Sequence, residues 1–379
     1  MTGPRTRVVF LVSTLRRTGP TSQLLNIARG LDREAFEPLV VTLSAEPSGS
    51  MQTSFVQHGL PVKSLSMSRI RGVLNRRWRD DLERMSGRRL EECVLHSQGI
   101  RADVISSQAL SGVPRLATAR NYPYDDYVMK YGGILGGWMA RRHLHALRSL
   151  PLVVACSTTL ASQLRPHRIE TTVIRNGVDT TQFKPPTLEE RVRARAALGI
   201  APGARVGLSL GSLVSRKDPL SVIQAVRTLA DPGFVMLLVG GGALEEECRR
   251  AAHDDERIRL TGHVADVLCY LQAADFLVSA SRSEGLPNSG LEALACGLPL
   301  VLSAIEPHRE LLEVAPSAGV LFPIGDVAAL ADALRTVTSS NAAVSGLAPG
   351  RATALIGAEQ VSRRYQALYR QLLDVVRRP

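Results

Sequence analysis

One stretch of the chain decides its fold: Ser281-Arg-Ser-Glu-Gly-Leu-Pro-Asn-Ser-Gly-Leu-Glu-Ala-Leu-Ala-Cys-Gly-Leu-Pro299. Apolar runs with the composition of buried strands stand on both sides of it, at residues 275–280 and 298–302. Pro287 cannot continue a helix backwards, Asn288 is a good N-cap, and the closing Gly-Leu-Pro stops a helix. The pattern predicts strand, loop, short helix and strand, which is the repeating unit of a parallel α/β sheet.

Two carboxylates flank the start of this predicted helix. Glu284 falls in the loop at the carboxyl end of the strand, and Glu292 falls on the first turn or so of the helix. A helix N-terminus carries roughly half a positive charge and free amide donors, which favours a phosphate. The carboxylates repel phosphate but accept hydrogen bonds from hydroxyl groups, so the combination indicates a nucleotide-sugar. The alternative is an acidic helix start that is stabilised only by the helix dipole.

In this context the spacing of Glu284 and Glu292 resembles the signature of the family-4 retaining glycosyltransferases. A bare pair of glutamates with seven residues between them occurs by chance, but the flanking G-L-P-N and A-C-G-L-P make the match specific. The resemblance implies an α/β protein with the GT-B fold, in which two Rossmann-like domains face each other across a cleft. It also implies that the second domain holds the nucleotide-sugar.

The rest of the chain agrees with two domains, because helical and strand patterns alternate through all 379 residues. Asn176-Gly177-Val-Asp resembles the crossover between the two lobes of the family. We therefore expect an acceptor-side Rossmann-like domain at 1–178 and a nucleotide-sugar-binding Rossmann-like domain at 179–350. The segment 351–379 is expected to be a helix that packs back on the first domain.

The chain is basic, with a net charge of +11, which favours anionic partners. Nucleic acid is the least favoured of these, because no zinc pattern, RNA-binding signature or aromatic-interleaved basic strand is present. The densest basic run, residues 69–89, is suited to peripheral contact with an anionic membrane surface. A solvated arginine-rich helix face explains the same run.

The cysteines are scattered and odd in number, which is typical of a reduced intracellular protein without a zinc site. No signal peptide opens the chain and no apolar run is long enough to span a bilayer. We therefore expect a cytoplasmic protein that can work at the inner face of the membrane. The five cysteines are Cys93, Cys156, Cys248, Cys269 and Cys296.

The second informative segment is Gly211-Ser-Leu-Val-Ser-Arg-Lys-Asp-Pro, at the end of another predicted strand. The resembled family places an arginine after the glycine and a lysine five residues later, both on the donor diphosphate. Lys217 matches the lysine, Ser212 replaces the arginine, and Arg216 adds a cation. A solvated cationic surface is the alternative. The resemblance implies donor contacts from Gly19, Ser212, Arg216, Lys217, Glu284, Gly285, Leu286, Pro287, Asn288, Ser289 and Glu292.

The first half of the chain carries the residues that the resemblance assigns to the acceptor side and to catalysis. Gly19 corresponds to the glycine loop of the family, between a strand and a helix. His96 matches the family's H-S-H-G stretch, in which Gln98 replaces the second histidine; a hydrogen-bonded structural histidine is the alternative. Arg120 stands where many relatives have a histidine near the reacting sugar. Because arginine stays charged and cannot act as a base, it is expected to bind an anionic group, with Tyr122 nearby.

The resemblance implies a metal-independent, retaining glycosyltransferase, with Glu284, Lys217, Arg120 and His96 as its catalytic set. The donor is expected to be a nucleoside-diphosphate-sugar and the acceptor a glycan or lipid-linked saccharide, and no cofactor is expected. The D-x-D motif of metal-dependent glycosyltransferases is absent. Two alternatives stay open, the first because of the departures at Ser212 and Arg120 and the second because it uses the same architecture. One is a nucleotide-binding scaffold subunit without turnover, and the other is a nucleotide-sugar epimerase or hydrolase.

Overall fold

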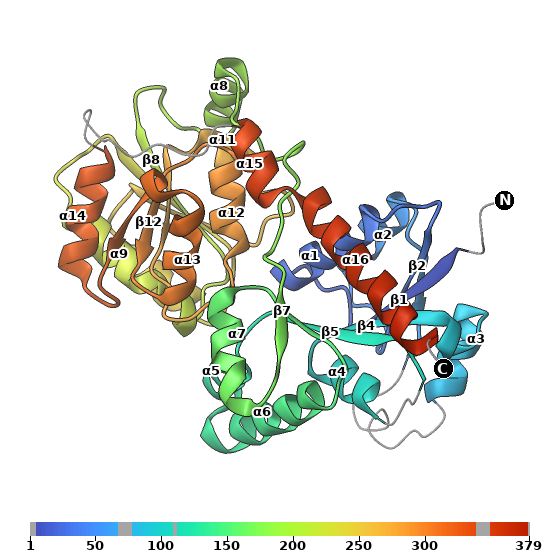
Figure 1. Ribbon diagram of the computed structural model, residues 1–379. Helices are drawn as coiled ribbons and strands as arrows, with labels where there is room; N and C mark the ends of the chain where they lie inside the picture. The colour runs from blue at the N-terminus through green and yellow to red at the C-terminus, as the bar shows by residue number, and fades with distance from the viewer. Residues whose placement is uncertain (1–4, 67–77, 109–111, 339–348, 378–379) are drawn as a thin grey trace. The chain divides into compact units, whose positions relative to one another are not determined.

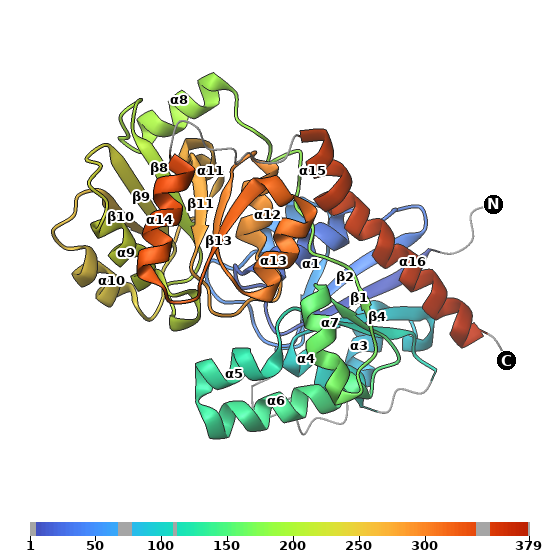
Figure 2. The same ribbon diagram turned by 60° about the vertical axis from the view of Figure 1, so that its left-hand side comes forward.

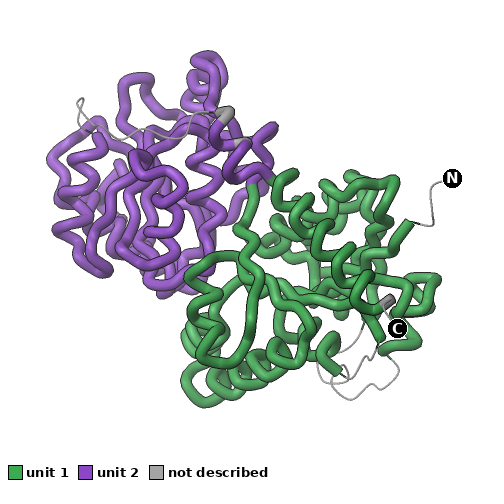
Figure 3. Tube along the Cα trace, in the orientation of Figure 1, with its two compact units in different colours: residues 1–177, 358–379 green, residues 178–357 purple. Residues whose placement is uncertain are grey.

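The computed structural model describes residues 5–66, 78–108, 112–338 and 349–377. The chain divides into two compact units, shown in Figure 3. Unit 1 comprises Met1–Gly177 and Ala358–Pro379, and unit 2 comprises Val178–Gly357. Each unit has its own hydrophobic core and its own parallel sheet, so the predicted α/β class is confirmed.

Unit 1 is built on a parallel sheet that has seven strands within the described residues, in the order β3-β2-β1-β4-β5-β6-β7. Helices cover both faces, so the central strands are apolar along their length instead of alternating. Residues 8–11 of β1, for example, are all 0% exposed. The strands are β1 (Thr6–Val12), β2 (Phe36–Thr42), β3 (Val62–Ser64), β4 (Cys93–Gln98), β5 (Arg115–Ala119), β6 (Val153–Ala155) and β7 (Thr171–Val173).

The last long helix, α16 (Ala358–Arg377), belongs to unit 1 although it ends the chain (Figure 1). It packs against α1 and buries Tyr365 and Tyr369 completely in the core that contains Phe36. The other helices of this unit are α1 (Gly19–Arg29), α2 (Gln52–Gln57), α3 (Trp78–Ser86), α4 (Ile100–Ser107), α5 (Pro123–Tyr131), α6 (Gly133–Arg148) and α7 (Thr158–Leu164), with short 3-10 turns η2 (Leu90–Glu92) and η3 (Arg165–His167).

Unit 2 has a parallel sheet that reverses its strand order in the middle. Within the described residues it has six strands in the order β10-β9-β8-β11-β12-β13, so the chain moves outward from β8 and then returns to β8's other side. Ligands of open α/β sheets bind beyond the carboxyl ends of the strands at such a reversal. The strands are β8 (Arg205–Leu210), β9 (Phe234–Val239), β10 (Ile258–Gly262), β11 (Phe276–Ser279), β12 (Leu300–Ser303) and β13 (Gly319–Phe322).

The helices of unit 2 begin with clear local signals. α8 starts at a capping box, in which Thr187 and Glu190 satisfy each other's backbone amides. Proline occupies the first turn of α9 and α13, where its missing N–H costs nothing. The helices are α8 (Leu188–Ala197), α9 (Pro219–Arg227), α10 (Glu245–Ala252), α11 (Leu268–Ala273), α12 (Asn288–Ala295), α13 (Glu306–Val314), α14 (Val327–Thr338) and α15 (Pro349–Ile356), with turns η4 (Ser215–Lys217) and η5 (Pro316–Ala318).

Some predicted segments differ in detail. The helical segment from residue 351 onward is interrupted at Gly357, where a backbone bridge to Val178 separates α15 from α16. Of the basic run 69–89, residues 69–77 lie outside the described residues, and the remainder begins with α3. Among the helices that the structure describes, none combines the length and the apolar character needed to cross a bilayer.

Candidate functional site

The predicted loop and helix lie at the strand-order reversal of unit 2. β11 ends at Ser279, and α12 begins at Asn288 with Pro287 as its N-cap. The prediction that Asn288 itself is the cap was one residue late, because Pro287 already has the extended backbone of a cap. Leu286 and Pro287 are buried and fix the loop, whereas Asn288 and Ser289 remain half-exposed at the helix start.

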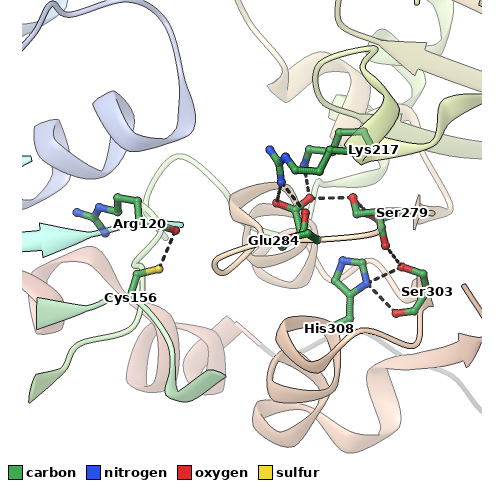
Figure 4. A network of polar contacts seen from close by, with 10 residues as sticks. Arg120, Cys156, Lys217, Ser279, Glu284, Ser303 and His308 are labelled. Carbon is green, nitrogen blue, oxygen red and sulfur yellow. Dashed lines mark hydrogen bonds and ion pairs between the residues drawn. The ribbon is translucent and has the colours of Figure 1, made fainter. Parts of the chain in front are cut away.

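Glu284 is the centre of a polar network between two neighbouring loops (Figure 4). Its Oε2 accepts a hydrogen bond from Nη1 of Arg216 at 2.9 Å, and its Oε1 forms an ion pair with Nζ of Lys217. The Ser281 hydroxyl donates to Oε1 at 2.8 Å. The sequence motifs at 211–219 and 281–299 are therefore brought together at one carboxylate.

The charges of this network are set by burial and by the two cations. Burial alone would raise the pKa of Glu284, but Lys217 and Arg216 outweigh it and lower the pKa to about 2. Glu284 is thus a carboxylate across the physiological range. For Glu292, one turn into α12, no cation among the described residues offsets burial, which raises the pKa of this carboxyl to about 8. One glutamate is ionised and the other is protonated at neutral pH.

The loop that carries Lys217 is held from two sides. Arg282 donates through Nε and Nη2 to Oδ2 of Asp218, at 3.1 and 2.8 Å, and its backbone amide donates to the Arg216 carbonyl at 2.8 Å. Asp218 has a left-handed backbone with φ of 48°, an uncommon conformation for a residue other than glycine. These contacts hold the Lys217 turn against the Glu284 loop.

The glycines at 240–242 have a structural explanation. A Cβ atom at Gly240 would lie 2.0 Å from the carbonyl oxygen of Gly211, and one at Gly242 would lie 2.3 Å from that of Leu213. The Gly241 carbonyl accepts from the Leu213 amide at 3.0 Å. The glycines therefore let the loop after β9 pack directly on the loop after β8, and this contact supports the Lys217 turn.

His308 belongs to the same site and was not predicted from the sequence. It lies in α13 and is 0% exposed, with Nδ1 at 2.8 Å from the Ser303 carbonyl oxygen. Among the described residues its Nε2 has no hydrogen-bond partner, and Figure 4 shows this nitrogen on the side of Glu284. Burial lowers the pKa of His308 to about 4, so the ring is neutral. The available signal was its place after β12, the strand next to β11.

In unit 1, Arg120 follows the carboxyl end of β5 and is 9% exposed. Its Nε donates to Oε1 of Gln98 at 3.1 Å and its Nη1 contacts Oδ1 of Asn176. Its Nη2 is buried and, among the described residues, has no hydrogen-bond partner. The hydroxyl of Tyr122 forms a hydrogen bond of 2.8 Å with Nε2 of His167.

His96 does not lie where an acceptor could touch it. It is 1% exposed, with Nδ1 at 2.8 Å from the Tyr369 hydroxyl and Nε2 at 2.8 Å from Oγ1 of Thr118. Burial lowers its pKa to about 3, so it is a neutral residue with both nitrogens occupied. This geometry supports the alternative of a structural histidine, and the predicted catalytic role of His96 is withdrawn.

Gly19 is not part of a free glycine loop. It is the first residue of α1, after the N-cap Thr18, and Pro20 follows it in the first turn. The start of α1 still follows the carboxyl end of β1, where the resemblance implies a donor contact from Gly19. Within the described residues, His, Cys, Asp and Glu side chains form no group of three or more with the arrangement of metal ligands.

Two doubly wound parallel sheets, with a cationic turn and a helix start at a strand-order reversal, define a protein of the Rossmann-like nucleotide-binding class. Two family patterns match the chain: "Glycosyltransferase Family 4" over residues 18–182 and "Glycosyl transferases group 1" over residues 204–340. The chain therefore belongs to the family-4 glycosyltransferases, and the resemblance seen in the sequence is confirmed.

Individual curated relatives match only part of the chain, at moderate sequence identity. The GDP-mannose-dependent monoacylated alpha-(1-6)-phosphatidylinositol monomannoside mannosyltransferase of Corynebacterium glutamicum is 32% identical over 171 residues, 42% of this chain and 44% of the relative. The lipopolysaccharide core biosynthesis mannosyltransferase LpsB of Rhizobium meliloti is 26% identical over 242 residues, 60% of this chain and 67% of the relative. This chain thus spans about half to two thirds of the length of these relatives.

A solved structure matches nearly the whole chain. Anabaena Alr3699/HepE in complex with UDP and glucose has a TM-score of 0.80 and 18% sequence identity, over 96% of this chain and 99% of that one. At this identity the match shows the fold alone, and the predicted GT-B fold is confirmed by it.

Proposed function

We propose that this chain transfers a sugar from a nucleoside-diphosphate-sugar to a glycan or lipid-linked acceptor, with retention of anomeric configuration. The observation that carries the proposal is the ionised Glu284 between Lys217 and Arg216 at the strand-order reversal of unit 2. A carboxylate that can accept hydrogen bonds from hydroxyl groups thereby lies beside two cations that can donate hydrogen bonds to a diphosphate. This is the pair of functions that a nucleotide-sugar requires.

Each residue receives a role from its chemistry. Lys217 and Arg216, with side chains 19% and 22% exposed, bind the diphosphate together with the amides of residues 286–289 at the start of α12. Glu284 accepts hydrogen bonds from the hydroxyls of the transferred sugar, and Glu292 accepts them from the ribose. The ammonium of Lys217 has three donors, so it can contact Glu284 and a phosphate together.

The main catalytic effect assigned to this site is stabilisation of the departing diphosphate. Negative charge grows on the leaving group as the glycosidic bond to the nucleotide breaks, and fixed donors in a partly buried site stabilise it most at that moment. No covalent nucleophile is assigned. Gly285 and Ser212 lie on the same two loops and are proposed to approach the donor through their backbones.

The relatives' names indicate which substrates to try first. One relative is named as GDP-mannose-dependent and acts on a phosphatidylinositol mannoside, and the solved neighbour holds UDP and glucose. We therefore propose a GDP- or UDP-hexose as donor and a lipid-linked saccharide as acceptor. The acceptor side is assigned to unit 1, where Arg120 has a buried donor atom without a partner among the described residues.

The test is incubation with UDP-, GDP- and ADP-sugars, with and without a phosphatidylinositol monomannoside or a polyprenyl diphosphate saccharide, followed by mass spectrometry. The proposal requires a product whose mass equals the acceptor plus one sugar residue (the sugar less one water), and a release of nucleoside diphosphate that increases when acceptor is present. Nucleotide binding without release would instead indicate a scaffold subunit. A changed or hydrolysed donor that is independent of acceptor would indicate an epimerase or hydrolase.

Glu292 gives the proposal a pH dependence. Its pKa of about 8 means that the free protein holds a proton on this carboxyl at neutral pH. Ribose hydroxyls donate best to the carboxylate, so bound nucleotide lowers this pKa. Between the two pKa values, binding of UDP or GDP should release up to about one proton, and affinity should rise with pH and level off above about pH 8.

Calorimetric titration of nucleotide in buffers of different ionisation enthalpy measures this release. The control is Glu292→Gln, which keeps the shape and removes the ionisable group, so its binding enthalpy should not depend on the buffer. If the unaltered protein shows the same buffer-independent enthalpy at neutral pH, Glu292 does not contact the ribose as a carboxylate.

A further inference from the structure

Unit 1 has a cationic pocket that the proposed reaction does not use. It has a volume of about 380 Å³ and lies where the C-terminal half of α6 meets η3 and the start of α5. Among the described residues, three arginines and two histidines line it, and no carboxylate does. The lining residues are Tyr124, Arg141, Leu144, His145, Arg148, Pro166, His167 and Arg168.

No carboxylate among the described residues is paired with the arginines of this pocket. Most other arginines of the described residues that have printed partners are paired with carboxylates, whereas Arg141, Arg148 and Arg168 make no ion pair within the described residues. Arg148 instead lies 3.4 Å from Nδ1 of His145, itself a lining residue. Three like charges around one hollow repel each other, and a bound anion removes that repulsion.

Two further features show that the η3 wall of the pocket is held in a defined position. Arg168 has a left-handed backbone with φ of 57° and ψ of 42°, which is unfavourable for a residue with a side chain. The His167 ring is stacked on Tyr124, with ring centroids 6.2 Å apart, and its Nε2 is 2.8 Å from the Tyr122 hydroxyl. The wall formed by η3 is thereby fixed against the start of α5.

The same face of α6 continues from the pocket to an apolar end. Ile134, Trp138, Arg141, His145 and Arg148 follow one another by four, three, four and three residues, which places them on one stripe of a helix. All five are exposed; Ile134 is 93% and Trp138 54% exposed. The stripe is therefore apolar at the beginning of α6 and cationic near its end, about 10 Å further along.

The apolar end is wider than this stripe. Met129, Tyr131 and Leu135 are 49%, 43% and 52% exposed at the junction of α5 and α6. Two cations lie among them, because Lys130 is placed over the Tyr131 ring and Arg142 over the Trp138 ring, at 5.2 and 5.5 Å from the centroids. Aromatic and basic side chains together are typical of surfaces that contact the headgroup region of a bilayer.

Backbone contact and hydrogen bonds hold together the hairpin that presents this surface. Figure 2 shows α5 and α6 side by side, and a Cβ atom at Gly136 would lie 2.3 Å from the Tyr127 carbonyl oxygen, so the helices are in backbone contact. His143 ties the hairpin to α4: its Nε2 is 2.8 Å from Oδ2 of the fully buried Asp103, and its Nδ1 is 2.9 Å from the Tyr127 hydroxyl.

We propose that the α6 pocket binds the phosphate headgroup of a membrane lipid while the α5–α6 junction contacts the apolar edge of the bilayer. A lipid combines a phosphate and an apolar chain in the order in which this helix face offers cations and apolar side chains. Arginine is suited to the phosphate because its planar fork donates two hydrogen bonds to it. A soluble phosphate would use the pocket but would leave the apolar junction without a role.

The experiment is sedimentation of the full chain with phosphatidylcholine vesicles, with and without phosphatidic acid. The wild-type chain should sediment only with phosphatidic acid present, and Arg141→Gln/Arg148→Gln/Arg168→Gln should reduce this binding by about tenfold or more. The control, Arg193→Gln/Arg249→Gln/Arg335→Gln, removes the same charge from exposed positions in unit 2 and should bind like the wild type. Thermal unfolding of both variants checks that they are folded.

Tryptophan fluorescence reports on the apolar junction, because the chain has two tryptophans and Trp78 is only 6% exposed. Vesicles with phosphatidic acid should shift the emission to the blue, and Trp138→Phe should lose most of the shift. Equal sedimentation of the two triple variants would overturn the assignment of the α6 pocket as the phosphate site. Binding of glycerol 3-phosphate to the wild type without any vesicle binding would overturn the lipid assignment.

Discussion

Lys217→Ala is expected to lower kcat by about 10²–10³-fold, the cost of losing one fixed donor to a developing negative charge. The side chain of Lys217 is 19% exposed and pairs with a carboxylate that is 7% exposed, so its position is defined before any ligand arrives. Its loss removes the positive charge that would stabilise the departing diphosphate. It also means that Glu284 is paired with Arg216 alone. The measurement is the steady-state rate of sugar transfer, with the donor identified by the incubations with UDP-, GDP- and ADP-sugars.

Two further variants separate charge from structure. Lys217→Arg keeps the cation but not its compact shape, and is expected to retain part of the activity. Ser215→Ala alters the first residue of the same turn, an exposed side chain outside the proposed site, and should leave kcat unchanged. If Lys217→Ala transfers sugar at the wild-type rate, the diphosphate role of Lys217 is wrong.

Glu284→Gln tests the other half of the network. The amide keeps the size of the side chain but cannot form the ion pairs with Lys217 and Arg216, which hold the pKa of Glu284 at about 2. We expect a loss of transfer similar to that of Lys217→Ala, with the two losses less than additive because the residues share one network. Additive losses in the double variant would show that the two residues act separately.

The strand-loop-helix order and the pairing of the two loops could be predicted because their signals are local. Apolar runs mark β8 and β11, Pro287 marks the helix start, and parallel strands bring their carboxyl ends to one edge. Glu284 and Lys217 are 67 residues apart, yet each follows a neighbouring central strand. Their meeting therefore followed from the fold class and needed no knowledge of side-chain packing.

The rest of the site depends on contacts that no local pattern encodes. His308 joins the network only because β12 pairs with β11, and its short E-P-H-R-E segment resembles any helix start. His96 lies at the end of a strand as predicted, but Tyr365 and Tyr369 come from α16, more than 260 residues later, and cover it. Burial by a distant helix decided between the functional and the structural histidine.

Gly240→Ala is the substitution with the largest expected effect on stability, about 3 kcal/mol, and it should also lower activity. Gly240 has φ of 140°, and a Cβ there would lie 2.0 Å from the backbone oxygen of Gly211, which cannot move aside as a flexible side chain can. Either the loop after β8 shifts, which displaces Lys217, or the strand end distorts. Denaturant unfolding of the full chain, followed by circular dichroism, measures the first effect.

The neighbouring Gly241 provides the matched control for this prediction. Its backbone is not left-handed, and an added Cβ would meet first the Glu245 carboxylate at 3.1 Å, the far end of a flexible side chain. Gly241→Ala should therefore change the free energy of unfolding by less than about 1 kcal/mol and leave transfer intact. A Cβ atom at Gly242 would again meet a backbone oxygen, at 2.3 Å. Alanine at Gly240 or Gly242 should therefore lower the free energy of unfolding far more than alanine at Gly241. Equal tolerance at all three positions would mean that the Lys217 turn does not depend on this backbone contact.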